Sequence, residues 1–436
     1  MTGLKLLATS LLLVGGTLLP FRASYALENE CSADFVSLDG ASYLVKPSGD
    51  DDTENIECAL NSAVNQGIST VKLHTGNFQV SSLEILNFEG SLQGLSKKAT
   101  TLSIEDYTFD CTESKARPLV FKGGDVTIET MTIAVSDPCY EGEHFTLLSF
   151  MQISCEKRTH FANVDRVNFE GATIPESNTT AVSSFGTLDD SCENNGNGPL
   201  GTLKVNRSEI SGFSTAVYSE IWAGGQVDIN YNTITNVNGG IYIGNANQST
   251  TITGNTIEYA SKETSVNYGY TFGVAIESWQ PYAPTKNRTV IHSNIFTQGD
   301  YYTFAEDGST ISLGIWVSPY NGLRPSHAIV ISDNKLNTHE ILQDQADVWG
   351  MFIGDTDAPT ISGNLFRGSG TYGVVVGAYT TGTPTNSGTI TGNSFANASY
   401  IWGDIVLGEL SQNIIVGPGS AYVRDISGNN FDLSNL

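Results

Sequence analysis

Two glutamates occupy equivalent positions in two similar segments of the sequence, Ala216–Glu220 and Gly273–Glu277. The related segment Gly240–Gly244 lies between them and has glycine at that position. If the three segments stack as neighbouring strands, Glu220 and Glu277 lie two strands apart, or about 9.6 Å at the usual spacing. Inverting glycosidases hold their two carboxyl groups roughly 6.5–9.5 Å apart, which leaves room for a water molecule. The spacing therefore predicts a glycoside hydrolase with Glu277 as general acid and Glu220 as general base, and it leaves the opposite order open.

Aromatic residues recur beside these glutamates. Alternate side chains of a strand share a face, so the glutamates and a column of aromatic rings are expected to point outward together. Aromatic rings stack on the apolar faces of sugars, and a Trp that desolvates a carboxyl group raises its pKa. The predicted substrate-contacting residues are Tyr218, Trp222, Tyr242, Trp279, Trp316, Tyr320 and Phe352. Two other interpretations stay open, namely solvated surface glutamates and aromatic side chains that pack beneath loops.

Other chemistries fit parts of the sequence. A calcium-assisted lyase acting on a uronate polymer would need a cationic or deprotonated base, for which the candidates are Lys262, Lys286, Arg288, Arg324, Arg367, His292 and His327. Oxygen ligands for calcium would come from Asp300, Glu306, Asp307, Asp344 and Asp347, although no known calcium-loop spacing is present. Apart from this open calcium alternative, we predict no cofactor and no metal site. A third hypothesis is an adhesin that binds glycan without cutting it.

Two further kinds of site are not predicted. A Ser-His-Asp triad receives no support, because no Gly-x-Ser-x-Gly turn joins a strand to a helix. The chain also has no glycine-rich phosphate loop or dinucleotide fingerprint. The carboxylate pair therefore carries the prediction of a polysaccharide-degrading enzyme.

The elements that position these residues are indicated by an internal repeat. An apolar residue, two spacers, Asn, any residue and then Ile, Leu or Phe recur seven times, at Asn232, Asn255, Asn294, Asn334, Asn364, Asn393 and Asn429. The intervals between these asparagines are 23, 39, 40, 30, 29 and 36 residues, which indicates a rung of about 23 residues with insertions. Stacked rungs bury columns of Ile and Val, and an Asn in the same turn of each rung can bond to the next. The repeat predicts an all-β chain folded as a right-handed parallel β-helix solenoid.

Residues 51–67 carry the one convincing helical pattern, with Ile56, Ala59, Leu60, Ala63 and Val64 on a single stripe. With the segments Asp51–Ile56 and Val71–Phe78, and then Gly90 and Gly94, the start of the chain resembles the N-terminal part of the pectate-lyase-like superfamily. Members of that superfamily usually have Pro where this chain has His74. The resemblance implies a secreted carbohydrate-active protein in which an N-terminal α-helix caps the solenoid.

The first residues are typical of a secretory signal peptide. Lys5 precedes the apolar run Leu6–Leu19, and small residues lead to a predicted cleavage after Ala26. We therefore predict residues 1–26 as signal peptide and 27–436 as one β-helix domain, in which residues 27–70 form the N-terminal segment and cap helix. The expected location is extracellular or periplasmic.

Charge and cysteine content agree with export. The chain has 21 Lys and Arg against 46 Asp and Glu, and removing residues 1–26, with Lys5 and Arg22, takes its net charge from −25 to −27. This balance argues against nucleic acid or an anionic membrane as partner and leaves a polysaccharide or oligosaccharide, while oligomeric state stays open.

The six cysteines are Cys31, Cys58, Cys111, Cys139, Cys155 and Cys192. They allow 15 disulfide connectivities, among which we expect sequential pairing, with Cys31–Cys58 tying the leading segment to the helix.

Overall fold

The three-dimensional structure is a computed structural model. It describes residues 31–104, 117–136, 145–151, 160–172, 179–185, 201–220, 226–244, 249–260, 270–277, 287–299, 310–318, 327–339, 346–354, 356, 358–377, 385–418 and 421–432. The predicted signal peptide and the cysteines Cys111, Cys139, Cys155 and Cys192 lie outside these residues. Residues 31–436 form one unit, which is described here by itself.

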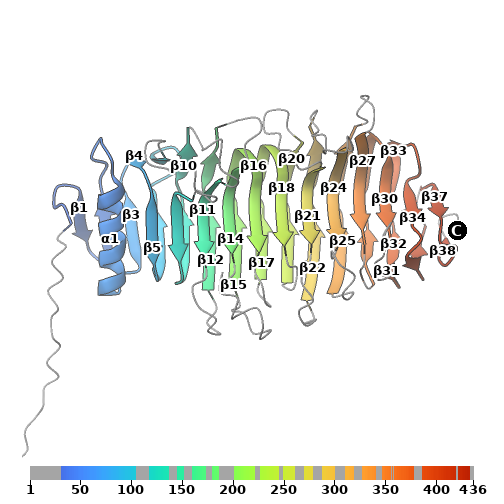
Figure 1. The fold of residues 1–436 in the computed structure, drawn as a ribbon, viewed down its shortest axis with the longest axis horizontal. Helices are drawn as coiled ribbons and strands as arrows, with labels where there is room; N and C mark the ends of the chain where they lie inside the picture. The colour runs from blue at the N-terminus through green and yellow to red at the C-terminus, as the bar shows by residue number, and fades with distance from the viewer. Residues whose placement is uncertain are drawn as a thin grey trace, which may run out of the picture. The chain divides into compact units, whose positions relative to one another are not determined.

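The first face of the solenoid is a sheet of 15 described strands, all paired in parallel except β1 with β2. In spatial order these strands are β1 (Val36–Asp39), β2 (Ser42–Val45), β3 (Thr70–Leu73), β6 (Gly90–Gln93), β9 (Val126–Glu129), β12 (His160–Asp165), β15 (Gly201–Asn206), β17 (Gln226–Asn230), β19 (Ser249–Thr253), β22 (Asn287–His292), β25 (His327–Ser332), β28 (Thr360–Ser362), β32 (Thr389–Thr391), β36 (Ile415–Val416) and β38 (Phe431–Asp432). Each strand pairs with one from the next rung, so the chain advances along the stack (Figure 1).

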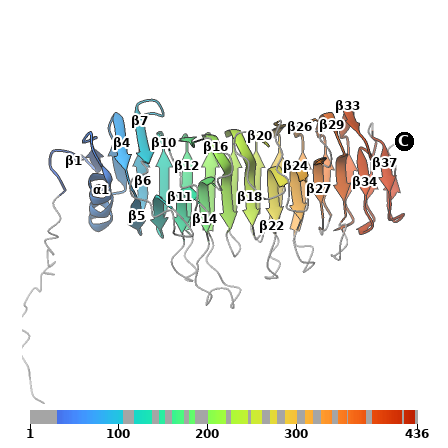
Figure 2. The same cartoon turned by 45° about the horizontal axis from the view of Figure 1, so that its top comes forward.

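Two further faces share a second sheet of 21 described strands. The second face contains β4 (Gly76–Val80), β7 (Thr100–Ile104), β10 (Thr132–Val135), β13 (Asn168–Glu170), β20 (Thr256–Tyr259), β23 (Ile295–Gln298), β26 (Lys335–Thr338), β29 (Leu365–Gly370) and β33 (Ser394–Tyr400). The third face contains β5 (Leu83–Leu86), β8 (Leu119–Lys122), β11 (Phe145–Met151), β14 (Thr179–Phe185), β21 (Tyr270–Glu277), β24 (Thr310–Ser318), β27 (Ala346–Ile353), β30 (Tyr372–Val376), β34 (Ile405–Leu407) and β37 (Val423–Asp425). β16 (Glu209–Glu220) and β18 (Thr233–Gly244) run through both faces, and β31 (Thr385–Asn386) pairs with β35 (Ser411–Gln412) in a small separate sheet. Figure 2 shows the same stack of strands from a second side. This is the right-handed parallel β-helix that the repeat predicts.

The core consists of columns of like side chains. On the first face, one fully buried column runs in register through Val205, Ile229, Ile252, Ile291, Ile331, Ile361 and Ile390. β-branched side chains suit this arrangement, because they pack well against the same side chain on a neighbouring strand. No single rung can bury its own apolar face, so neighbouring rungs stabilise one another.

An asparagine ladder runs beside this column. Its members are Asn232, Asn255, Asn294, Asn334, Asn364 and Asn393. The side-chain oxygen of each of the last five accepts the backbone N–H of the asparagine one rung earlier, at 2.9–3.0 Å. The same oxygen accepts that residue's side-chain amide, so each asparagine satisfies buried polar groups of two rungs.

The prediction that Asn429 is the seventh member of the ladder is wrong. Asn429 lies in register with Asn413, in a different turn, because Ile415 pairs with Phe431. At that turn the side-chain oxygen of Asn430 accepts the backbone N–H of Ile414. The last repeat therefore has the right sequence pattern in the wrong corner of the solenoid.

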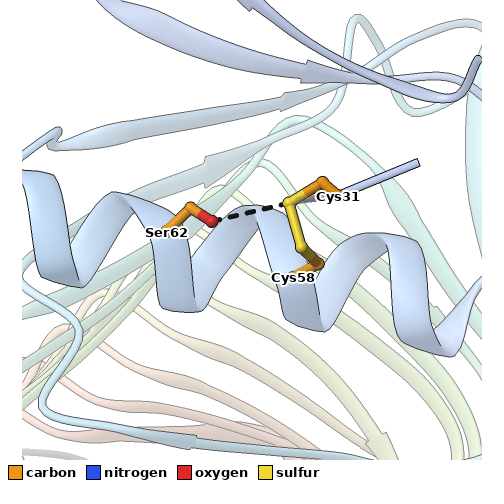
Figure 3. Close-up of a disulfide and its surroundings, with 3 residues drawn as sticks. All are labelled: Cys31, Cys58 and Ser62. Atoms are coloured by element: carbon orange, nitrogen blue, oxygen red, sulfur yellow. Dashed lines mark hydrogen bonds between the residues drawn. A yellow bond between two sulfur atoms is a disulfide. The ribbon is translucent and has the colours of Figure 1, made fainter. Parts of the chain in front are cut away.

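The predicted helix is α1 (Thr53–Gln66), which buries Ile56, Ala59, Leu60 and Ala63 and packs on β2, β3 and β5. It ends at Gly67, whose φ of 67° is the left-handed conformation that glycine favours. Figure 3 shows the predicted Cys31–Cys58 disulfide, which joins the leading segment to this helix, with the Ser62 hydroxyl 3.4 Å from the Cys31 sulfur. Within the described part of the chain, α1 is too short and too polar to cross a membrane.

Candidate functional site

Strand register on the third face brings the predicted carboxylate positions into one column. Glu220 at the end of β16 pairs with Gly244 at the end of β18. Ile243 pairs with Ile276, so Glu277 takes the next position along, two rungs from Glu220. At the usual strand spacing their backbones lie about 9.6 Å apart, and Gly244 places no side chain between them. The register is the one expected from the sequence.

Glu277 is a buried carboxyl group with a defined partner. Its side chain is only 4% exposed, and the Tyr242 hydroxyl donates a hydrogen bond to its Oε2 at 2.8 Å. Burial raises the pKa of Glu277 above the ordinary glutamate value, although the hydrogen bond from Tyr242 acts in the opposite direction. A carboxyl group that holds its proton at higher pH is suited to general acid catalysis.

Glu220 has a similar partner but is less buried. The Tyr218 hydroxyl donates to its Oε2 at 3.0 Å within the same strand. Tyr218 and Tyr242 lie in register on adjacent rungs, and their rings stack with centroids 4.9 Å apart and planes 12° apart. The two glutamates are therefore joined by two hydrogen bonds and a stacked tyrosine pair. The i, i+2 spacing of Tyr218 and Glu220 is the sequence signal for this contact, because such residues share one face of a strand.

The aromatic column is in the predicted register but is less open than expected. Trp316 lies two rungs beyond Tyr242, and Phe352 pairs with it on the following rung. The rings of Trp316 and Phe352 are half-buried, and Tyr242 is only 7% exposed. Ala275 occupies the rung between Tyr242 and Trp316. The described aromatic residues of this column are therefore buried or half-buried, and not the exposed surface that the sequence predicted. Trp222, Trp279 and Tyr320 lie outside the described residues.

A second outward column, which we did not predict, explains this burial. Phe272, Leu313, Trp349 and Tyr372 pair in succession one position before the glycine of each segment. Phe272 packs in a cluster with Tyr242, Ala275 and Trp316, while the Trp349 ring lies 5.5 Å from the Phe352 ring. The signal was the apolar residue before Gly273, Gly314, Gly350 and Gly373.

The repeated glycine has a steric cause. A Cβ atom on Gly273 would lie 2.6 Å from the carbonyl oxygen of Gly314 and 2.6 Å from the ring of Phe296. Real Cβ atoms do not come this close to other atoms, so on this rung the corner between the second and third faces closes only around glycine. The same corner positions the outward residues that follow it.

The alternative lyase residues fall elsewhere. Arg288, His292 and His327 belong to first-face strands and Arg367 to the second face. Asp347 lies on β27 of the third face, in register with Ile311. The remaining base and calcium candidates, Lys262, Lys286, Arg324, Asp300, Glu306, Asp307 and Asp344, lie outside the described residues. Over the described ranges, no three His, Cys, Asp or Glu side chains gather as a metal site would require.

Comparisons with known proteins find likeness among solved structures only. No protein-family model matches the chain, and no curated protein does. The A-module of mannuronan C-5 epimerase AlgE6 from Azotobacter vinelandii is 11% identical, with a TM-score of 0.45 over 88% of this chain and 94% of that chain. The Streptococcus pneumoniae surface protein and adhesin PfbA is 12% identical, with a TM-score of 0.45 over 87% and 97%. Tailspike protein 3 of bacteriophage CBA120 is 12% identical, with a TM-score of 0.46 over 94% and 64%. At these identities the likeness concerns the fold alone.

Proposed function

We propose that the chain is a secreted carbohydrate-active enzyme that hydrolyses a polysaccharide or oligosaccharide on its third face. One observation carries this proposal: the buried carboxyl group of Glu277, with its raised pKa, lies two rungs from the less buried Glu220 across a glycine. Two carboxyl groups in different environments are the arrangement that acid–base cleavage of a glycosidic bond requires.

The chemistry assigns one role to each carboxyl group. Glu277 donates its proton to the glycosidic oxygen as the bond from that oxygen to the anomeric carbon breaks. Glu220 accepts a proton from a water molecule whose oxygen attacks the anomeric carbon from the opposite face. Tyr242 and Tyr218 orient the two groups through the Oε2 atom of each. The product sugar has the inverted anomeric configuration.

The proposed substrate is an uncharged glycan. Strands β14, β16, β18, β21, β24 and β27 contain no Lys, Arg or His within their described bounds. A polyuronate at this face would meet two glutamates and a chain of net charge −25 without a cation from these strands. Half-buried aromatic rings next to the glutamates offer apolar contact to a neutral sugar instead.

The test is a panel of neutral and acidic glycans incubated with the purified chain. New reducing ends without ultraviolet absorbance are expected from a neutral glycan, and Glu277→Gln is expected to lower their rate of formation at least 100-fold. Glu220→Gln is expected to act in the same direction. The control is Glu258→Gln, which changes an exposed glutamate on the second face.

Three outcomes contradict the proposal. An ultraviolet-absorbing unsaturated product indicates a lyase, and glycan binding without any product indicates an adhesin. Full activity in both Glu277→Gln and Glu220→Gln removes the carboxylate pair from the reaction.

A further inference from the structure

A second cluster of reactive side chains lies at the turn after first-face strands β22 and β25, among residues that the proposed glycan site does not use. The Ser293 hydroxyl oxygen lies 2.9 Å from Nε2 of His292. The other ring nitrogen of His292, Nδ1, lies 3.3 Å from Oδ2 of Asp333 and 2.9 Å from the Ser332 hydroxyl. The side chains of His292 and Asp333 are 41% and 58% exposed, so small molecules in solution can reach them.

Nδ1 of His292 has two neighbours, the Ser332 hydroxyl and the Asp333 carboxylate. A negative charge on Asp333, whose Oδ2 lies 3.3 Å from Nδ1, favours the tautomer of neutral His292 that carries its hydrogen on Nδ1 and has a free electron pair on Nε2. Nε2 then accepts the hydrogen bond that the Ser293 hydroxyl donates. This is the order of roles in a Ser-His-Asp triad, with serine as nucleophile, histidine as base and aspartate as the group that orients the base.

The asparagine ladder holds the cluster in place. Ser293 and Asp333 each precede a ladder asparagine, and both have φ of 56° in the left-handed region. The backbone N–H of Ser293 donates to the carbonyl oxygen of Ser332, which fixes it to the rung that carries Asp333. The backbone N–H of Asn294 donates to Oδ1 of Asn334 at 2.9 Å. A nucleophile on such a fixed turn loses little freedom when it reacts.

We propose that Ser293 is an activated nucleophile that accepts acyl groups from small carboxylic esters. The Ser293 oxygen forms a bond to the ester carbonyl carbon while its proton passes to Nε2 of His292. The bond to the ester's alkoxy oxygen then breaks, and the alcohol leaves with that proton. Water attacks the acyl-serine with His292 again as base, which releases the carboxylic acid and restores Ser293. Asp333 stabilises the imidazolium ion in both steps.

The reaction is expected to be slow. The backbone N–H groups of Ser293 and Asn294, which lie closest in the chain to the nucleophile, are already bonded to Ser332 and Asn334. The absence of one oxyanion donor typically costs a factor of about 10²–10³ in rate. The acyl-serine is therefore a better readout than turnover.

The experiment incubates the full chain with p-nitrophenyl acetate or a fluorophosphonate and follows the modified serines by peptide mass spectrometry. Ser387 is the internal control, because its φ of 57° matches that of Ser293 but its hydroxyl donates to Asn386 and to no imidazole. Ser293 is expected to be modified at least tenfold faster than Ser387.

Matched variants separate the triad from mere exposure. His292→Gln and Asp333→Asn are expected to slow the modification of Ser293 to the rate of Ser387. The thermal unfolding midpoint of each variant checks that the turn still folds. Equal modification of Ser293 and Ser387, or a Ser293 rate that is unchanged in His292→Gln and Asp333→Asn, overturns the proposal. Glycan cleavage does not enter these readouts, so the proposed function can fail or stand independently.

Discussion

At the scale of single residues, the carboxyl group of Glu277 is subject to two opposing effects. Burial raises its pKa, and the hydrogen bond from Tyr242 lowers it. The sequence indicated the position of this residue and its neighbour Gly244, because both follow from the repeat. It did not indicate that Tyr242 bonds to Glu277, because that contact joins different rungs and depends on how each side chain turns.

Replacing the tyrosine should shift the pH dependence of catalysis. Tyr242→Phe removes the hydrogen bond that stabilises the carboxylate, so the pKa of Glu277 should rise further. A general acid works while it is protonated, so the alkaline limb of the kcat profile should move to higher pH. Tyr231→Phe, at an exposed turn, is the control. A limb that stays in place or moves to lower pH contradicts the assignment of Glu277 as the acid.

The same carboxyl group should make stability depend on pH. Because its pKa is raised on folding, the folded state binds the proton more tightly than the unfolded state. The resulting stability is fully present below the unfolded pKa and is lost as pH rises through the folded pKa. Glu277→Gln should remove this loss, so its unfolding temperature relative to the original chain should increase as pH rises above 4.5, the ordinary value. A difference that is constant with pH contradicts the burial of a titrating carboxyl group.

At the scale of elements, the register of the third face was predictable and its burial was not. The repeated segment begins at the corner of a rung, with Gly in most copies and Ala216 in one, so the columns through Tyr218 and Glu220 could be aligned from the sequence. The alignment began at that glycine and omitted the preceding residue, so Phe272 and Trp349 were missed. Packing between rungs, which local spacing does not report, turned an expected open surface into half-buried clusters.

One ladder asparagine should stabilise the solenoid strongly. The side chain of Asn294 is fully buried, accepts two hydrogen bonds from Asn255, and donates to Ile252 and Asn334. Asn294→Ala leaves these buried groups without partners, at about 1–3 kcal/mol for each unsatisfied group. We expect a loss of about 3 kcal/mol or more in the free energy of unfolding by denaturant. The exposed Asn397→Ala should change it by less than about 0.5 kcal/mol, and equal effects would contradict the structural role of the ladder.

At the scale of the whole described unit, stability is spread along the stack. Each described rung pairs with the rungs before and after it, so its stability depends on these two neighbours. The repeat in the sequence therefore predicted the architecture well, whereas the last repeat was assigned to the wrong turn. Asn429 fits the sequence pattern, but only the strand pairing of Phe431 shows which corner it occupies.

Removing one whole rung should preserve the fold. Deletion of residues 233–255 takes out β18 and β19 and joins Asn232 to Thr256, which pairs with Thr233 in the intact chain. The shortened chain should keep its β-sheet circular dichroism and cooperative unfolding, but lose glycan cleavage, because Tyr242 and Gly244 are gone. Deletion of residues 233–244 alone removes half a rung and should abolish cooperative unfolding. Similar unfolding of the two deletion variants contradicts the conclusion that each rung depends on the rungs before and after it.

The asparagine ladder also bears on how such a chain can evolve. Consecutive ladder residues are 23 to 40 positions apart in sequence, yet their backbone-to-side-chain hydrogen bonds all measure 2.9–3.0 Å. The ladder thus keeps successive rungs in phase whatever length of chain connects them. Insertions between rungs can lengthen, shorten or change in composition without altering the stacked core. Selection can then act on those insertions and on specificity while the folding determinants stay constant.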